Sequence, residues 1–456
     1  MIWDASLISK YNLTGPRYTS YPTAPQFNES ISKISLVDKM LAPSDSPLSL
    51  YFHIPFCAHL CYYCGCNKIV TKQYDKGDEY VELLGEEMRL RSLMLDPNRQ
   101  VTQLHFGGGT PTFLREEQLS KLFDYIKEYF NLINDGSQDY SIEIDPREIS
   151  KSKLELLHRM GINRVSIGVQ DFNSQVQKAV HRIQSFELVK DLVSDVRNLG
   201  IKSVNFDLIY GLPNQTVEGV RESLKKALSL SPDRISLFNY AHLPERFPAQ
   251  KRIPAESLPP ADSKLAILKM SIQLLIESGY EYIGMDHFAK PTDSLALAQK
   301  EELLQRNFQG YTTHLGTELI AFGVSSISNL NGIYIQNHTN LDRYKTCIEN
   351  GQLAINKGYI SDFDDKLRHR VIMTLITSFK LECHIIEKEF DICFHEYFQN
   401  EVAKLREYLD DGMLEILQNN NKVTYKVTGK GRLLIRCICM VFDKYLGQNT
   451  SYSKVI

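Results

Sequence analysis

Residues 51–66 read YFHIPFCAHLCYYCGC, an apolar segment that runs directly into a loop with four cysteines. Three of these, Cys57, Cys61 and Cys64, follow the spacing C-x3-C-x2-C, so one short loop can wrap three thiolates around a single inorganic centre. Thiolates bind both zinc and iron–sulfur clusters. A structural zinc needs a further ligand, whereas three ligands on a four-iron cluster leave one iron open to a substrate. Buried structural thiols or a zinc site remain the alternative.

The other five cysteines all lie in the C-terminal third of the 456-residue chain, so this clustering is far from an even distribution. The first residues, MIWDAS, lack the basic flank and apolar stretch of a secretory signal. We therefore expect a cytoplasmic protein. In a reducing compartment clustered thiols hold a metal more often than they form disulfides.

The composition is that of an ordinary globular chain. Lys and Arg number 52 and Asp and Glu 55, which gives a formal net charge of −3, and 43% of the residues are hydrophobic. No basic field indicates a nucleic-acid partner, and no apolar stretch approaches the ~18 residues that a membrane span needs. The length predicts more than one domain.

Strand-like segments alternate with helix-periodic ones from residue 48 onward. The strand-like segments are residues 48–53, 101–106, 140–145, 164–170, 203–210 and 234–241. This alternation predicts parallel βαβ units with right-handed crossovers, in either an open doubly wound sheet or a partial barrel. Residues 280–288 and 319–328 are predicted as two further strands.

The two ends of the chain have a different character. Residues 1–45 are rich in proline and are predicted as an irregular arm that acts as a lid. After residue 330 we predict helices at 367–379 and 394–409, a hairpin of 413–417 and 422–427 around Asn419-Asn420-Asn421, and a final helix near Gly431. The predicted domains are thus 1–45, a catalytic α/β domain at 46–330, and a small, mainly helical domain at 331–456 that resembles a winged helix.

A glycine run, Gly107-Gly108-Gly109-Thr110-Pro111, directly follows the second strand-like segment. Glycines in this place let a ligand approach the backbone closely, since no Cβ stands in the way. The cysteine loop follows the preceding strand, so both loops are predicted at the carboxyl edge of the sheet. This edge is where α/β enzymes bind ligands.

These motifs resemble the radical S-adenosylmethionine (SAM) superfamily, whose signature is C-x3-C-x2-C with an aromatic residue, here Tyr63, before the last cysteine. The resemblance narrows to the oxygen-independent coproporphyrinogen III oxidases and extends over nearly the whole chain. The matching stretches include GPRYTSYPT (15–23), QLHFGGGTPT (103–112), EIDPRE (143–148), GVQDFN (168–173), DLIYGLP (207–213), FNYAHLP (238–244), GMDHF (284–288), RNFQGYTT (306–313) and KGRLLIR (430–436). The resemblance implies a three-quarter, TIM-like radical SAM barrel of about six βα units.

The resemblance also implies cofactors and site residues. Cys57, Cys61 and Cys64 would bind one [4Fe–4S] cluster, and two SAM molecules would share the active site. Positions that match the cluster-bound SAM are Tyr51, Gly108, Glu143 and Ile327. Positions that match the second SAM are Tyr63, Gly109, Thr110, Gln170, Arg182, Asp207 and Ala241. Cys66, Phe308 and Gln309 are candidate catalytic residues, and Arg17, Tyr240 and His242 are further candidates for binding the substrate.

Several of these residues have an ordinary structural alternative. Asp207 and Arg182, taken singly, are typical of surface charges or helix caps. Ile327 is typical of a core, and Tyr51 of a half-buried strand. Cys66 is equally typical of a small buried side chain.

The implied reaction is oxidative decarboxylation of two propionates of coproporphyrinogen III to vinyl groups, which yields protoporphyrinogen IX in haem biosynthesis through a 5′-deoxyadenosyl radical. A flavodoxin or ferredoxin system would donate electrons to a monomeric enzyme with no nucleic-acid or membrane partner. One alternative is a radical SAM tetrapyrrole methyltransferase that opens haem, against which Cys66 and residues 306–313 argue. The other is a non-catalytic haem chaperone, against which residues 15–23 argue.

Overall fold

The computed structural model describes residues 1–420, 422–447, 452, 454 and 455. The chain divides into two compact units. The barrel unit comprises Asn28–Leu274 and Gly316–Ile360, and the terminal unit comprises Met1–Phe27, Leu275–Leu315 and Ser361–Ile456. This grouping differs from the predicted division after residues 45 and 330.

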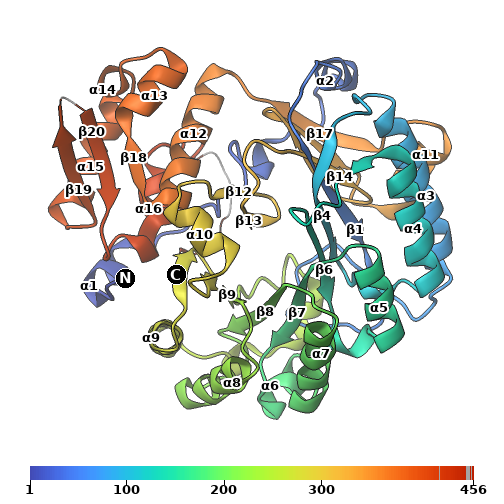
Figure 1. Cartoon of the computed structure of the whole chain (residues 1–456). Helices are drawn as coiled ribbons and strands as arrows, with labels where there is room; N and C mark the ends of the chain where they lie inside the picture. Colours follow the sequence, from blue (N-terminus) through green and yellow to red (C-terminus); the bar gives the residue numbers. More distant parts are fainter. Residues whose placement is uncertain (421, 448–451, 453, 456) are drawn as a thin grey trace. The chain divides into compact units, whose positions relative to one another are not determined.

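Six parallel strands form the centre of the barrel unit (Figure 1). They are β1 (Leu48–Ile54), β4 (Gln100–Gly108), β6 (Asp139–Ile144), β7 (Arg164–Gln170), β8 (Ser203–Tyr210) and β9 (Arg234–Asn239). Their order in the sheet is β9-β8-β7-β6-β4-β1, which is their order in the chain. A doubly wound sheet reverses its strand order at a switch point, and no such reversal occurs within these six strands. The structure therefore confirms the six βα units and selects the partial barrel.

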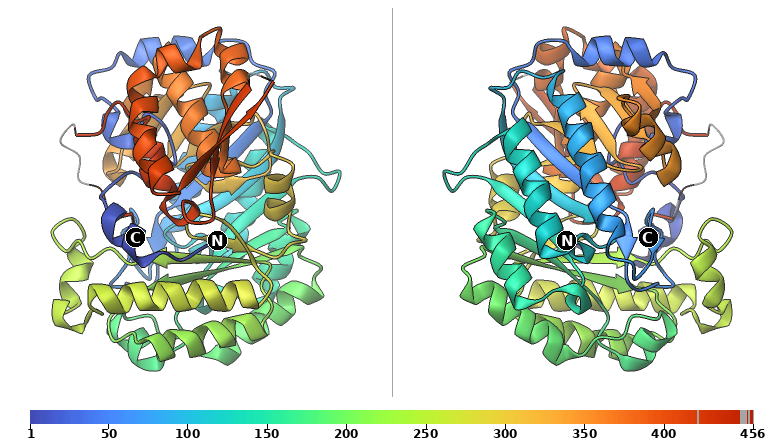
Figure 2. Two further views of the ribbon diagram at one scale, coloured as in Figure 1. Left: turned by 90° about the vertical axis from the view of Figure 1, so that its left-hand side faces the viewer. Right: turned by 90° about the vertical axis from the view of Figure 1, so that its right-hand side faces the viewer.

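Amphipathic helices connect these strands. They are α3 (Lys76–Ser92), α4 (Glu116–Tyr129), α5 (Lys151–Arg159), α6 (Ser174–Ala179), α7 (Phe186–Asn198), α8 (Val217–Ser229) and, after β9, α9 (Ala261–Glu277). Helix α4 shows why: Leu119, Leu122, Phe123 and Ile126 recur at three- and four-residue spacing and are all buried. Helices α3 and α4 pack side by side (Figure 2).

Further strands extend the sheet of the barrel unit beyond residue 330. Strand β14 (Glu318–Phe322) pairs in parallel with β1, and β15 (Ile327–Leu330), β16 (Ile333–Asn337) and β17 (Ile355–Ile360) follow as antiparallel neighbours. The segment 319–328, predicted as one strand, is two strands because Gly323 turns the backbone with a φ of +93°. Helix α11 (Leu341–Glu349) lies between β16 and β17. The short strand β5 (Asn131–Leu132) pairs with β4.

The prediction of an irregular arm is wrong for two of its segments. Helix α1 (Ala5–Tyr11) begins where the Asp4 carboxylate accepts from two backbone amides, and α2 (Lys33–Met40) begins where the Ser32 hydroxyl accepts from one. The prolines that indicated irregular backbone lie between residues 16 and 25, so helices form on both sides of them. Asn28 pairs with Gly358 beside β17, so the end of the arm belongs to the barrel unit.

The terminal unit contains two short hairpins. They are formed by β10 (Glu281–Gly284) with β11 (His287–Ala289) and by β12 (Gln305–Asn307) with β13 (Gly310–Thr312), and α10 (Ser294–Lys300) lies between them in the chain. Residues 280–288, predicted as one strand, are divided by a turn at Met285, whose φ is +54°.

The remainder of the terminal unit resembles a winged helix, as predicted. Its elements are α12 (Phe363–Ser378), β18 (Lys380–Glu382), α13 (Cys383–Phe390), α14 (Phe394–Tyr397), α15 (Gln399–Asp410), β19 (Leu414–Asn419), β20 (Lys422–Val427) and α16 (Ile435–Met440). Strands β18, β20 and β19 form an antiparallel sheet in that order, and β19 and β20 are the predicted hairpin. Asn421 of the predicted turn lies outside the described residues. Within the described ranges, every helix is too short or too polar to span a bilayer.

Candidate active site

A short pair of parallel strands closes the base of the cysteine loop. Strand β2 (Phe56–Cys57) pairs with β3 (Ile69–Val70), so the loop between them leaves and re-enters the fold at one point. The backbone N–H of Tyr62 donates to the carbonyl of Val180 at 3.0 Å, and the Gln250 side-chain amide donates to the carbonyl of Tyr63 at 3.0 Å. These bonds hold the loop against segments that follow β7 and β9.

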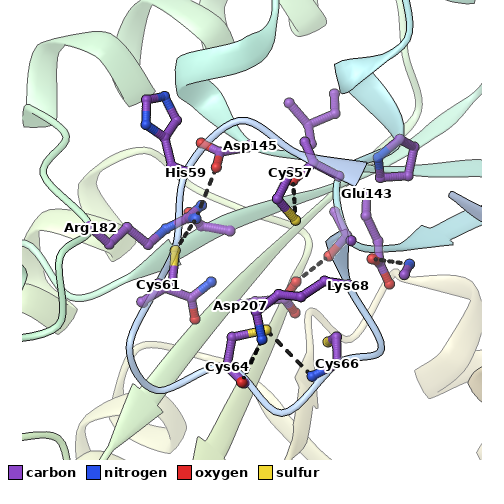
Figure 3. Close-up of a pocket in the computed structure, with 18 of the residues that line it drawn as sticks. Cys57, His59, Cys61, Cys64, Cys66, Lys68, Glu143, Asp145, Arg182 and Asp207 are labelled. Atoms are coloured by element: carbon purple, nitrogen blue, oxygen red, sulfur yellow. Dashed lines mark hydrogen bonds and ion pairs between the residues drawn. The ribbon is translucent and has the colours of Figure 1, made fainter. Parts of the chain in front are cut away.

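Twelve of the predicted site residues line one cavity of about 170 Å³ in the barrel unit, and the cavity is open to solvent. Figure 3 shows the cysteine loop around this cavity; Glu143 lies on β6, Asp207 on β8, and Arg182 in the segment after α6. The twelve residues are Cys57, Cys61, Tyr63, Cys64, Cys66, Gly108, Gly109, Thr110, Glu143, Gln170, Arg182 and Asp207.

Each cysteine of the C-x3-C-x2-C motif has a hydrogen-bond donor directed at its sulfur. The Thr110 hydroxyl donates to Cys57 Sγ at 3.4 Å, and the backbone N–H of Cys66 donates to Cys64 Sγ at 3.4 Å. The guanidinium groups of Arg147 and Arg182 donate to Cys61 Sγ, as described below. Such donors stabilise a sulfur that carries negative charge when it is a ligand.

The pKa values of two of these thiols move in opposite directions. Burial raises the pKa of Cys57 to about 12, whereas hydrogen bonding from Cys66, opposed by burial and helped by the charge of Lys68, lowers the pKa of Cys64 to about 6. Of these two thiols, Cys64 is therefore the one that ionises more readily before a metal binds.

The arrangement does not fit a single metal ion. Among the residues that the structure describes, no three His, Cys, Asp or Glu side chains gather closely enough to hold one ion. A zinc site requires four ligands at about 2.0–2.3 Å from one point. The three thiols instead lie around the wall of a cavity, which is the arrangement that a cluster of several iron atoms needs.

The glycine run is also required by close packing against the residues at the end of β1 and just after it, which the sequence did not reveal. A Cβ on Gly109 would lie 2.6 Å from the carbonyl oxygen of Pro55, and one on Gly108, whose φ is +110°, would lie 2.6 Å from the His53 ring. The Gly109 and Thr110 amides donate to carbonyls of residues 54 and 56 at 2.8 and 2.9 Å. The run therefore joins β4 to the base of the cysteine loop.

Two arginines and one aspartate form a buried network beside Cys61. Arg182 Nη1 donates to Asp145 at 3.0 Å and to Cys61 Sγ at 3.6 Å, and its Nη2 donates to the Gly168 carbonyl at 2.6 Å. Arg147 Nη2 donates to the same Asp145 oxygen at 2.7 Å and lies 3.7 Å from Cys61 Sγ. Burial opposes ionisation of Asp145, but Arg182 and Arg147 outweigh it and hold its pKa at about 2. Arg182 is thus an internal residue and not a surface charge.

The two acidic side chains of the cavity have different surroundings. Asp207 accepts from the Ser166 hydroxyl at 2.7 Å and from the Asn205 amide at 2.9 Å, yet burial raises its pKa to about 6. Glu143 is 43% exposed and accepts from the Gly108 backbone N–H at 3.1 Å. Glu143 is therefore accessible to a ligand. Burial disfavours the charged form of Asp207, and a cationic or hydrogen-bond-donating ligand would stabilise that form.

Three residues predicted to bind SAM are not among those that line the cavity: Tyr51, Ile327 and Ala241. The Tyr51 hydroxyl lies 3.2 Å from His53 Nδ1, and its ring stacks on His105 with 5.8 Å between ring centres. Ile327 begins β15 and is half-buried, and Ala241 follows β9 and is exposed.

The predicted substrate residues lie in both units. Phe308 and Gln309 form the turn of the β12–β13 hairpin in the terminal unit, where Arg17 Nη1 lies 2.9 Å from Asp286 Oδ2. In the barrel unit, Tyr240 and His242 contact each other, with 2.9 Å between the hydroxyl and Nδ1. Burial raises the pKa of Tyr240 to about 12.

Seven cavity residues were not among the predicted site residues: His59, Lys68, Pro111, Ile144, Asp145, Ser166 and Gly168. Arg147, which orders Asp145, was missed as well. A signal for Asp145 and Arg147 was present, because Asp145 ends a predicted strand at the ligand-binding edge and Arg147 follows it. Nothing local distinguishes Ser166 or Gly168 from other strand residues.

Three comparisons place this chain among known proteins. The model of the radical SAM superfamily matches residues 51–227. The chain is 48% identical over 449 residues to the oxygen-independent coproporphyrinogen III oxidase of Pseudomonas aeruginosa, which covers 97% of this chain and 96% of that protein. It is 46% identical over 457 residues to the protein of the same name from Escherichia coli K12, covering 100% of this chain and 98% of that protein.

A solved structure agrees with these relatives over the same length. The structure of the coproporphyrinogen III oxidase HemN from Escherichia coli, described as a radical SAM enzyme, superimposes with a TM-score of 0.92 at 45% identity. The match covers 98% of this chain and 99% of that one, so it includes both units.

Proposed function

Because this chain belongs to the family of the oxygen-independent coproporphyrinogen III oxidases, radical SAM enzymes of haem biosynthesis, we propose that its cavity carries out their reaction. In this reaction two propionate side chains of coproporphyrinogen III become vinyl groups and the product is protoporphyrinogen IX. Each propionate loses CO2 and one hydrogen atom, and one further electron passes to an acceptor. The arrangement of three thiols around one cavity, beside the glycine run, is the observation that carries the proposal.

Cys57, Cys61 and Cys64 are proposed to hold one [4Fe–4S] cluster. When bound, the cluster and SAM supply a 5′-deoxyadenosyl radical that removes hydrogen from the substrate. The protein's part is to hold the thiolates. Thr110 and the Cys66 amide donate to two of the sulfurs, and Arg182 lies against the third.

Two SAM molecules are proposed to occupy the cavity. Glu143 and Gly108 are assigned to the cluster-bound molecule, because Glu143 is exposed and its carboxylate can accept from an amino group. Tyr51 and Ile327 are assigned to the same molecule on the resemblance alone.

The second SAM is assigned to the other end of the cavity. Asp207 can accept from ribose hydroxyls or an ammonium group, and Arg182 has an Nε without a partner that can donate to a carboxylate. The remaining residues assigned to this molecule are Tyr63, Gly109, Thr110, Gln170 and Ala241.

Phe308, Gln309 and Cys66 are proposed to act on the substrate. Gln309 has a buried side-chain Nε2 without a hydrogen-bond partner, which suits a donor reserved for a ligand. We further propose that a flavodoxin or ferredoxin donates the electrons and that the enzyme acts as a monomer in the cytoplasm. All nine cysteines are free thiols, which supports a reducing compartment.

Anaerobic reconstitution with iron and sulfide tests the ligand set. We expect about four irons and four sulfides per chain in the wild type. Alanine at Cys57, Cys61 or Cys64 should abolish the cluster, whereas Cys66→Ala should retain it. Cys347→Ala, in helix α11, is the matched control. Iron retained by Cys57→Ala, or lost from Cys66→Ala, would contradict the assignment.

Product analysis separates this function from the two alternatives. With SAM, a reductant and coproporphyrinogen III, the mass should fall by the loss of two formic acid equivalents. Methylated or linear tetrapyrroles would indicate a methyltransferase that opens haem. Stoichiometric haem binding without SAM turnover would indicate a chaperone.

A further inference from the structure

Three arginines of the terminal unit gather around a single aspartate, and all four residues belong to that unit. Arg17 Nη1 lies 2.9 Å from Asp286 Oδ2. Burial lowers the pKa of Arg306 and of Arg436. The negative charge of Asp286 opposes this lowering of both pKa values, and the positive charge of Arg17 adds to it. Three guanidinium groups and one carboxylate give this arginine cluster an excess of positive charge.

Arg436 has its donors engaged by backbone carbonyls. Arg436 donates to the carbonyls of Pro16 and Gly15 in the N-terminal arm and to those of Lys454 and Val455. It therefore holds the arm in place, and Arg17, the next residue of the arm, reaches Asp286. Burial, followed by the charge of Arg17, lowers the pKa of Arg436 to about 10, so it remains a cation at neutral pH.

Arg306 is different, because it is buried and incompletely paired. Only 8% of its surface is exposed, and its Nε and Nη1 have no hydrogen-bond partner. Its guanidinium lies over the ring of Tyr311, its neighbour on the paired strand, with 4.8 Å to the ring centre. A ring face attracts the cation but accepts none of its in-plane N–H groups. A buried cation with unsatisfied donors is costly in a folded chain, so a missing partner is the natural explanation.

We propose that Arg306, with Arg17 beside it, binds a propionate carboxylate of the tetrapyrrole substrate. Guanidinium groups bind carboxylates strongly, and the substrate carries four propionates. Arg306 stands two residues before Phe308 and three before Gln309, so the hairpin β12–β13 presents an apolar ring, an amide donor and a cation together. This inference rests on the proposed function, since it names the substrate group that the arginine cluster recognises.

The test is a binding titration of the reconstituted enzyme with coproporphyrin III, the oxidised macrocycle, which retains all four carboxylates. Arg306→Gln is expected to weaken binding roughly tenfold to a hundredfold, the usual worth of a charge-assisted contact. Coproporphyrin III tetramethyl ester, which has no charged carboxylate, should bind wild type and variant equally. Arg370→Gln, which removes a 43% exposed arginine of the same unit, is the charge-matched control and should change the affinity less than twofold.

Two further arms make each outcome decisive. SAM also carries a carboxylate, so SAM affinity is measured in parallel, and a selective loss of SAM binding in Arg306→Gln would overturn the proposal. If Arg306→Gln does not fold, Asp286→Asn replaces it. Removing the competing carboxylate should tighten coproporphyrin III binding several-fold, and an unchanged or weaker affinity would overturn the proposal.

Turnover of coproporphyrinogen III by the wild type tests the proposed function separately. If the wild type is active and Arg306→Gln binds coproporphyrin III as tightly as wild type does, only the present inference fails. If the wild type retains its cluster but neither binds coproporphyrin III nor converts the substrate, the proposed function fails and this inference fails with it.

Discussion

Replacing Asp145 by asparagine removes the carboxylate that two buried arginines share. Arg182 and Arg147 each donate to the same oxygen, at 3.0 and 2.7 Å, and both arginines lie beside Cys61. The neutral amide of the Asp145→Asn variant would leave two cations close together with no negative charge between them. We expect the folded protein to lose stability at neutral pH.

The magnitude follows from the pKa of Asp145, which is about 2 instead of the ordinary 3.8. Each pKa unit corresponds to about 1.4 kcal/mol, so the ionised carboxylate contributes about 2 kcal/mol to the free energy of unfolding. Because the folded-state pKa is lowered, this contribution is present above about pH 4 and is lost as the pH falls through about 2. The free energy of unfolding falls further because Arg182 and Arg147 are left buried without a counter-charge. Breaking a buried ion pair typically costs about 3–5 kcal/mol.

Calorimetric unfolding of the cluster-free protein provides the assay, so that the result does not depend on iron content. A loss of about 2 kcal/mol lowers the melting temperature by roughly 3 to 4 °C for a unit of this size. Asp75→Asn is the matched control: Asp75 also pairs with an arginine, Arg115, but its side chain is 89% exposed. Its shift should stay below about 2 °C, because exposed ion pairs contribute little.

Two outcomes would refute this reasoning. One is an unchanged melting temperature for Asp145→Asn at pH 7, and the other is an equal shift for Asp75→Asn. Adding Arg147→Gln to Asp145→Asn should recover part of the loss, because one of the two stranded cations is then removed.

Three further substitutions have defined outcomes. Gly109→Ala is expected to lower both iron content and SAM affinity, because its Cβ would lie 2.6 Å from the Pro55 carbonyl; a full complement of iron with normal SAM binding contradicts this. Asp207→Asn is expected to raise the melting temperature of the ligand-free protein more at pH 8 than at pH 5. The raised pKa of about 6 means that the charged form of Asp207 costs most stability above pH 6, so a larger gain at pH 5 would be inconsistent. Glu143→Ala should lower the yield of 5′-deoxyadenosine without loss of iron, since Glu143 accepts from the Gly108 amide, and an unchanged yield argues against its role.

Local pattern was sufficient for the strands of the barrel and for the loops at their carboxyl ends. A buried parallel strand is a short apolar run, and its register along the chain follows from the turn residues around it. The cysteine spacing and the glycine run could be located for the same reason, since each is contained in one loop. The helices of the arm were missed because their caps, Asp4 and Ser32, are single polar residues that resemble any loop residue.

The chain by itself determined the parallel βαβ units, the cysteine loop and the family resemblance, because these depend on neighbours within a few residues. Only the tertiary structure decided which charges meet. Asp145 and Arg182 lie on different βα units, and Arg17 comes from a different segment of the terminal unit than Asp286 and Arg306. Such pairs depend on burial and on strand order, neither of which a local pattern contains. For the same reason the sequence could name Arg182 but not its partner Asp145, and it contained no indication that Arg306 is buried with donors to spare.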